Sequence, residues 1–400
     1  MVYAFSFMVA FALSTAMFST ILPKLISDYS LSLAQAGLFP VFSGFGTLTT
    51  MLLIGLIGDR FSKRISTGIA FAAMGVFLLC IGSLPPFLLL LVVFTMLSAS
   101  SSAFNLLITA YLSDVYGAER SRYINLLHVF FGLGSMAGPL YPILLNSLGL
   151  HWNASYLILS AVILIGSASY FLLFAKNPPT QPITDKGKDD DTDKEKDKSE
   201  VPATQVFTYR KLLTSPSMIA MCVFSFLYLG GHQMAFSTWF QTYLQWNDPL
   251  IYTPAFTSIC MTLYWIGMVA SRMLCAILSK RFSSRTFLLV GASVGSVVLI
   301  LGFAISQPWS WVVVAALLGF CTGPIYPVSF ALACEWFPKI SARVSSFVGF
   351  FSSTGGMFFG WLLGSVADVS FRGAMMIPVV TLIIVFSIVL FFFPKTSLKQ

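Results

Sequence analysis

Runs of apolar residues long enough to cross a lipid bilayer recur along the whole chain. A membrane-spanning helix needs about 20 predominantly apolar residues, and the chain of 400 residues contains twelve such runs. They lie at roughly 2–24, 33–57, 66–84, 87–113, 123–147, 153–175, 216–244, 253–278, 286–305, 308–334, 342–366 and 373–394. Only 10% of the residues are charged, against about 25% in soluble domains. We therefore predict an all-α membrane protein with twelve transmembrane helices.

Positive charges are distributed unevenly between the segments that join the predicted spans. If the N-terminus faces the cytoplasm, the inner segments carry twenty Lys and Arg residues and the outer loops carry only Lys24 and Arg372. Cytoplasmic loops hold the excess of Lys and Arg in membrane proteins. We therefore expect a multi-pass protein of the cell membrane with both termini in the cytoplasm. The first run is too long for a secretory signal, so we expect it to be retained as a span.

A charged stretch separates the sixth predicted span from the seventh. Residues 185–198 are almost entirely Asp, Glu and Lys, a composition that cannot bury enough apolar surface to fold. We predict an N-terminal six-helix half over residues 1–176, a cytoplasmic linker over 177–212 and a C-terminal six-helix half over 213–400.

Two loops recur at one fixed offset. Residues 60–64 (RFSKR), after the second span, match residues 281–285 (RFSSR), after the eighth, 221 residues later. The loops after the fourth and tenth spans keep the same offset at two positions, Asp114 with Glu335 and Arg122 with Arg343. Duplicated halves in parallel orientation, with substrate held between them near the membrane midplane, are typical of one large class of secondary transporters.

The loop after the second span also carries a recognisable motif. Residues 55–64 read GLIGDRFSKR, which resembles the G-x-x-x-D-R-x-G-R-R signature of the major facilitator superfamily, with Ser62 in place of the second glycine. The resemblance covers the whole chain and implies two parallel six-helix halves, the major facilitator fold. It also implies a cytoplasmic gate, in which charged residues pair across the bundle and latch the outward-open state. The residues at these positions are Asp59, Arg60, Arg64, Asp114, Arg122, Glu335 and Arg343.

Within the superfamily, the chain is most similar to the fucose/glucose:proton symporter family. The fifth span reads NLLHVFFGLG from Asn125, and the seventh reads YLGGHQMAFSTW from Tyr228. Members of that family often have a glutamate at the position of His232. The resemblance implies transport of a sugar.

Polar side chains inside the spans mark the expected solute site. Such groups are costly in a bilayer and face a cavity or a neighbouring helix. Amides and imidazoles match sugar hydroxyls, and an indole matches the apolar face of a sugar ring. A role in bonding packed helices together stays open for each of these groups. The expected substrate-binding residues are Asn105, His128, His232, Gln233, Trp239, Gln241, Trp265, Arg272 and Tyr326.

Acidic residues are absent from the centres of the predicted spans. All fifteen lie in loops, in the linker or at span ends, whereas an embedded carboxylate is the usual proton relay of pumps and symporters. Histidine titrates near neutral pH and can replace it. His128 and His232 are therefore the candidates for proton coupling. If neither is coupled, the protein is a uniporter.

Two other transport functions stay open on the sequence. Residues 134–139 (GSMAGP) partly resemble the antiporter signature of proton-coupled drug and metabolite exporters, although Tyr141 and Pro142 replace the glycine pair that usually follows. Arg272 favours an organic-anion transporter if it binds a carboxylate or a phosphate, unless its side chain extends to the cytoplasmic surface. A sensor on the same scaffold would need a long signalling tail.

No pattern in the sequence indicates catalysis or a cofactor. There is no nucleophile–base set and no metal-ligand spacing, and the six cysteines form no C-x-x-C pair. We predict no enzymatic activity, no cofactor and no metal. Topology accounts for the net charge of +8, so we expect no nucleic-acid partner. The expected partners are a small-molecule solute, the lipid bilayer and, in the symport mode, protons. We expect a monomer.

Overall fold

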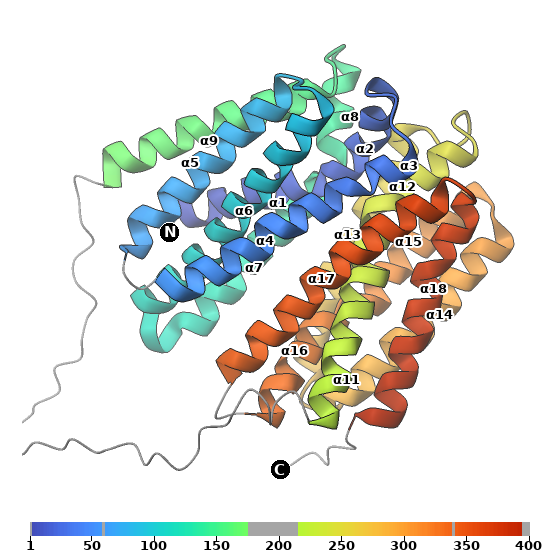
Figure 1. The fold of residues 1–400 in the computed structure, drawn as a ribbon. Helices are drawn as coiled ribbons and strands as arrows, with labels where there is room; N and C mark the ends of the chain where they lie inside the picture. Colours follow the sequence, from blue (N-terminus) through green and yellow to red (C-terminus); the bar gives the residue numbers. More distant parts are fainter. Residues whose placement is uncertain (1, 58–60, 175–214, 338–340, 394–400) are drawn as a thin grey trace, which may run out of the picture.

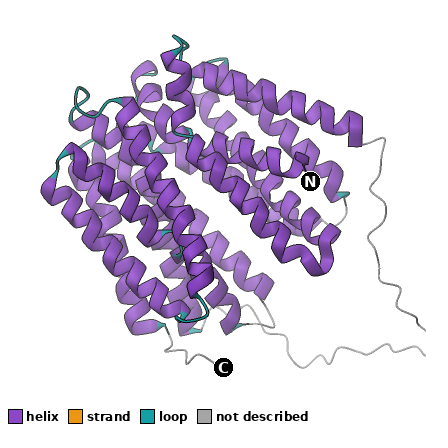
Figure 2. Cartoon of the chain, turned by 180° about the vertical axis from the view of Figure 1, so that it is seen from behind, coloured by secondary structure: helices purple, strands orange, loops and turns teal. Residues whose placement is uncertain are grey.

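The computed structural model describes residues 2–57, 61–174, 215–337 and 341–393, and every regular element in these ranges is a helix (Figures 1 and 2). The elements before the linker are α1 Val2–Ala16, α2 Phe18–Asp28, α3 Leu33–Ala36, α4 Leu38–Ile57, α5 Lys63–Gly82, α6 Phe87–Tyr116, the 3₁₀ helix η2 Gly117–Glu119, α7 Arg120–Ala137, α8 Leu140–Ser147 and α9 Asn153–Phe174. The elements after it are α11 Pro216–Ser225, the π-helix η3 Phe226–Met234, α12 Ala235–Asn247, α13 Pro254–Leu278, α14 Ser284–Ile305, α15 Pro308–Thr322, α16 Ile325–Trp336, α17 Ser341–Ala367 and α18 Phe371–Phe392.

The described helices supply ten candidate membrane spans, or twelve if each of two bent helix pairs is one span. Ten helical runs are long and apolar enough to span a bilayer, and two bent pairs meet the same criterion together. The bends measure 41° between α1 and α2 and 42° between α7 and α8. Pro139 stands at the second bend, where its missing N–H interrupts the helical ladder. With each bent pair counted as one span, the number agrees with the twelve predicted spans.

The helices form two bundles that lie side by side. Figure 1 shows α1 to α9 in one bundle, coloured blue to green, and α11 to α18 in the other, coloured yellow-green to red. We call the end where α9 stops and α11 starts the linker end, and the end with the α2–α3 and α17–α18 turns the far end. The bundles meet at the far end and diverge toward the linker end (Figure 1). The exact limits of the three predicted parts stay a prediction, because residues 175–214 lie outside the described ranges.

Helix boundaries follow the repeat found in the sequence. Two helices of the first bundle have a counterpart in the second that starts 221 residues later: α5 at Lys63 with α14 at Ser284, and α6 at Phe87 with α15 at Pro308. The two bundles are therefore built on one plan.

Contacts between the bundles come mainly from a few helices. In the first bundle these are α2, α3, α4, α7 and α8, and in the second they are α12, α13 and α17. The helices α5, α9, α14 and α18 pack mainly within their own bundle. At the far end of the α4–α17 pair, a Cβ added at Gly37 would lie 3.0 Å from the carbonyl oxygen of Gly360. Small residues there allow the two backbones to approach closely.

Candidate solute-binding site and gates

A buried polar cluster joins the two bundles at the far end. Gln241 of α12 donates from Nε2 to Ser19 Oγ and to Thr20 Oγ1 of α2, each at 3.0 Å. Its Oε1 accepts from Thr257 Oγ1 at 3.3 Å and from Ser258 Oγ at 3.2 Å, both in α13. The Gln241 side chain is fully buried, and both ends of its amide are bonded. We call these five residues the far gate, because they close the interface at this end.

The repeat explains why Thr20 and Gln241 meet. The two residues are 221 positions apart, so they are equivalent positions in the two halves. Parallel repeats are related by an axis along the membrane normal, and equivalent residues touch only where they lie close to that axis. The far gate therefore stands on the axis between the bundles, where a solute path would run.

A carboxylate forms a second link at the far end. Asp368, which follows α17, accepts from the backbone N–H groups of Leu33 at 2.8 Å and Ala34 at 3.1 Å. These amides lie in the first turn of a helix and have no partner within that helix. A negative charge is favourable at that position. Asp368 therefore ties the eleventh span to the start of the second.

Arg272 of α13 is fixed at a break in the tenth span. The carbonyl of Gly323, between α15 and α16, lacks the usual donor four residues later because that residue is Pro327. Arg272 Nε donates to this carbonyl at 3.0 Å. Tyr228 of η3 donates its hydroxyl to the neighbouring carbonyl of Thr322 at 2.6 Å. Arg272 thus replaces the hydrogen bond that Pro327 removes, and Tyr228 adds a second side-chain bond at the same break.

His128 lies toward the second bundle, near Arg272. On α7, His128 and Gly132 are four residues apart and share a face. Gly132 packs against Val269 of α13, which in turn is three residues before Arg272. His128 is exposed and within electrostatic range of Arg272. The structure therefore brings these two predicted site residues together across the interface.

His232 is placed differently. It lies in the π-helix η3, is fully buried, and bonds through Nδ1 to the carbonyl oxygen of Pro378 in α18 at 3.3 Å. Because a carbonyl only accepts, Nδ1 carries the proton and Nε2 is left as an acceptor. The ring lies between Tyr228 and Phe236. In this structure His232 therefore faces α18 of its own bundle.

The remaining predicted ligands differ in burial. Trp239 is fully buried and packs edge-on against Phe371. Trp265 and Gln233 are partly buried, and each has one buried polar atom, Nε1 and Oε1 respectively, with no hydrogen bond within the described chain. Asn105 and Tyr326 are also partly buried and occupy equivalent positions 221 residues apart.

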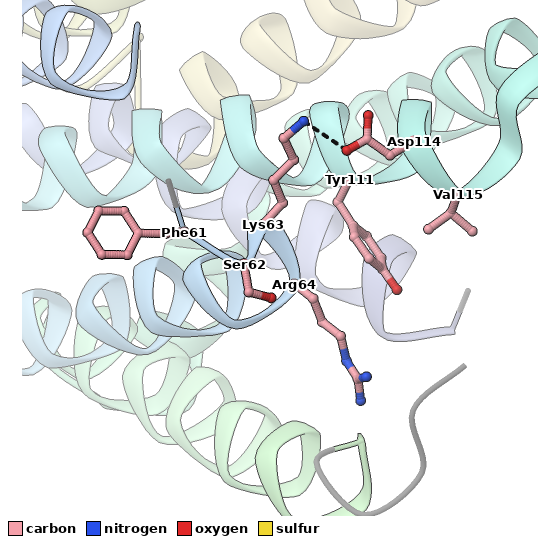
Figure 3. Close-up of a pocket in the computed structure, with 7 residues that line it drawn as sticks. All are labelled: Phe61, Ser62, Lys63, Arg64, Tyr111, Asp114 and Val115. Carbon is pink, nitrogen blue, oxygen red and sulfur yellow. Dashed lines mark hydrogen bonds and ion pairs between the residues drawn. The ribbon is translucent and has the colours of Figure 1, made fainter. Parts of the chain in front are cut away.

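The expected cytoplasmic gate is only partly described. Lys63 Nζ and Asp114 Oδ2 form an ion pair at 2.8 Å within the first bundle. Figure 3 shows this pair at the rim of a cavity of about 430 Å³, lined by Phe61, Ser62, Lys63, Arg64, Tyr111, Asp114 and Val115. Arg122 lies 3.7 Å from Glu119, three residues away.

The other predicted gate residues either are exposed or lie outside the described residues. Glu335 is exposed near the end of α16. Asp59 and Arg60 lie outside the described residues, as does the side chain of Arg343. The ion pairs Lys63–Asp114 and Arg122–Glu119 both lie inside the first bundle, and the two bundles diverge toward this end (Figure 1). The latch therefore stays a prediction.

Sequence reasoning missed four far-gate residues and Asp368. Ser19, Thr20, Thr257 and Ser258 resemble the many Ser and Thr residues that bond within their own helix. One signal could have found Thr20, since subtracting the repeat offset of 221 from Gln241 leads to it. Asp368 lies at the end of a span, where acidic residues are common. Its role becomes visible only when its partners, the backbone amides of Leu33 and Ala34, are known.

Two repeated helical bundles, joined by a gate at one end and holding polar groups between them, define a secondary transporter. A solute reaches such an interface from one side of the membrane at a time. The chain belongs to the Major Facilitator Superfamily, whose family model matches residues 4–258 and 246–400. It is thus a membrane transporter and not an enzyme.

Solved structures show the same fold at low sequence identity. The nucleoside transporter NupG matches with a TM-score of 0.73 at 15% identity, over 99% of each chain. A bacterial homologue of the human lysosomal transporter Spinster, in an inward-facing and occupied conformation, matches with a TM-score of 0.71 at 14% identity, over 97% of this chain and 95% of that one. Its inward-facing, unoccupied form matches with a TM-score of 0.71 at 15% identity, over 100% and 98%. No curated protein matches the sequence.

Proposed function

We propose that this protein moves a small polar solute across the cell membrane by alternating access, with its linker end in the cytoplasm. The observation that carries the proposal is the far gate, which bonds the bundles together at one end while they diverge at the other. The excess of Lys and Arg in the segments at the linker end supports the orientation. In this orientation the structure is the inward-facing state, the state named for the similar Spinster homologue.

The solute class that the side chains favour is a sugar or another hydroxyl-rich molecule. Asn105, His128, Gln233 and Tyr326 donate or accept hydrogen bonds, and the indole of Trp265 presents both an apolar face and an unpartnered N–H. The similar protein NupG is named as a nucleoside transporter, and a nucleoside also carries sugar hydroxyls. Nucleosides therefore belong in the test panel beside monosaccharides.

Two predicted ligands take other roles in this state. Both ends of the Gln241 amide are hydrogen-bonded within the far gate, and Trp239 is fully buried. We assign both to the site only when the far gate opens. The solute then breaks the far gate by taking over hydrogen bonds of Gln241.

Coupling to protons, if present, is assigned to His128 before His232. The His128 ring is exposed at the interface between the bundles, so a proton and a solute reach it. His232 is sealed against α18. At the linker end, Asp59, Arg60, Arg64, Asp114, Arg122, Glu335 and Arg343 are assigned to a latch that forms when that end closes.

The test is counterflow in liposomes that contain the purified full-length chain. Vesicles are loaded with an unlabelled monosaccharide or nucleoside, and uptake of the labelled form is followed with and without an inward proton gradient. Uptake that ignores the gradient indicates uniport. Accumulation that needs the gradient and is lost in His128→Ala, but not in His232→Ala, supports the coupling assignment. Failure of folded protein to exchange any member of the panel would contradict the proposed solute class.

A further inference from the structure

We infer that the transported solute carries an anionic group, a carboxylate or a phosphate, which binds the two terminal nitrogens of Arg272 between the bundles. This inference rests on the proposed function and narrows its solute class. It assigns to Arg272 a ligand of opposite charge, and to His128 a place beside that ligand.

The first argument is the position of the guanidinium group. Helical side chains lean toward the N-terminus of their helix, and the N-terminus of α13 is at the far end, so Arg272 leans away from the linker-end surface. Its Nε is bonded to the carbonyl of Gly323, which lies near the middle of the 29-residue span Pro308–Trp336. The side chain is therefore anchored inside the membrane and does not extend to the surface.

The second argument is charge balance. An embedded arginine is costly unless an acid, a carbonyl or water compensates it. The acidic residues of the described ranges lie at helix ends or in turns, namely Asp28, Asp114, Glu119, Asp248, Glu335 and Asp368. Within these ranges, Arg272 forms no ion pair, and its one hydrogen bond uses Nε. The positive charge therefore has no protein counter-charge.

The third argument concerns the two Arg272 nitrogens that the bond to Gly323 does not use. With Nε occupied, Nη1 and Nη2 make no hydrogen bond in the described chain, and neither is sealed from solvent. These two nitrogens form a fork that matches two oxygens of a carboxylate or phosphate. A guanidinium already fixed through Nε loses little further freedom when it binds an anion.

Neutral hydrogen-bonding groups lie near the guanidinium group of Arg272. Tyr264 is fully buried and is within electrostatic range of Arg272. His128 approaches from the other bundle. An anion held by Arg272 and His128 would bridge the two halves, so its binding would be linked to their relative movement.

The test compares matched neutral and anionic solutes in the same liposomes. Full-length wild-type protein is assayed for counterflow of glucose, glucuronate, glucose 6-phosphate, a nucleoside and the nucleoside monophosphate. We expect at least one anionic member to exchange faster than its neutral counterpart. In Arg272→Gln that anionic exchange falls at least tenfold, while exchange of the neutral counterpart changes less than twofold. Arg272→Lys retains part of the anion preference.

The ratio of anionic to neutral exchange separates binding from folding. Arg272→Gln also removes the bond to Gly323, and a folding defect would lower both rates together and leave the ratio unchanged. Arg285→Gln is the matched control, because Arg285 also donates to backbone carbonyls of its own bundle, those of Val389 and Leu390, but at the linker end. We expect that control to keep the wild-type ratio.

Each remaining outcome would contradict the anion inference alone, or the anion inference and the proposed solute class together. Exchange of neutral solutes only, unchanged in Arg272→Gln, would overturn the anion inference and leave the proposed function standing. An unchanged ratio in Arg272→Gln with anionic exchange intact would do the same. No exchange of any solute by folded wild-type protein would overturn the proposed solute class and the inference together.

Discussion

Replacing Gln241 by leucine should shift the protein from the inward-facing toward the outward-facing state. The change keeps the approximate size of the side chain and removes the two hydrogen bonds that cross from α12 to Ser19 and Thr20. Interhelical hydrogen bonds in membranes contribute about 0.6 kcal/mol on average and at most about 1.7. Loss of two therefore weakens the closed far end by about 1–3 kcal/mol, which is roughly a 5- to 150-fold change in the ratio of the two states.

The shift is measured by distances between spin labels at each end of the molecule. Leu148 and Leu250, 69% and 89% exposed, lie in far-end turns of the two bundles. Phe61 and Phe282, 60% and 48% exposed, serve at the linker end. In Gln241→Leu we expect a new, longer distance at the far end and a shorter one at the linker end.

A neighbouring glutamine supplies the control for this prediction. Gln245 lies one turn along α12 and donates from Nε2 to Thr257 at 2.9 Å, within the second bundle. Gln245→Leu removes an amide from the same helix but no bond between the bundles. We expect it to keep the wild-type distances. Wild-type distance distributions in Gln241→Leu, or an equal shift in both variants, would refute the assignment of the far gate.

The remaining predictions concern three other sites. Asp368→Asn removes the charge from the start of α3, a contribution of about 0.3–1 kcal/mol, so the far-end label distances should shift in the same direction as in Gln241→Leu but less; a larger shift would contradict the ranking. Gly230→Ala places a methyl group against the α17 backbone, and its thermal unfolding temperature in detergent should fall well below that of Gly166→Ala, whose added methyl would be 3.3 Å from one side-chain atom, in the ring of Phe7. Asp114→Asn removes the ion pair between Asp114 and Lys63, whose side chains are 58% and 28% exposed, respectively. The free energy of unfolding should therefore change by less than about 1 kcal/mol. A loss of transport at unchanged stability would support the latch.

The fold followed from the sequence because the bilayer imposes length and composition on each span. The twelve apolar runs correspond to ten spans and two bent pairs, and the repeat offset of 221 residues reappears in the starts of the helices. The apolar pattern could not reveal where a helix is locally distorted or bent. The π-helix around His232 and the bend at Pro139 arise from helix packing and a missing N–H, which leave hydropathy unchanged.

The candidate site could be predicted as a set of residue types but not as an arrangement. The sequence singles out polar residues inside spans by their type, yet it contains no direction for a side chain. Gln241 and His232 both lie in the seventh span, nine residues apart. The first bonds to the other bundle and the second to α18 of its own. That difference depends on helix rotation, which is set by packing against neighbours.

The sequence by itself determined the membrane environment, the number of spans and the duplicated plan, since each depends on composition and order along the chain. Only the tertiary structure decided which end of the bundle is closed and which groups face each other. Thr20 and Gln241 meet because symmetry brings equivalent positions to one axis, and Arg272 is held in the membrane because Pro327 leaves a carbonyl free. Such contacts join residues far apart in the chain, so they exist only once the helices have packed.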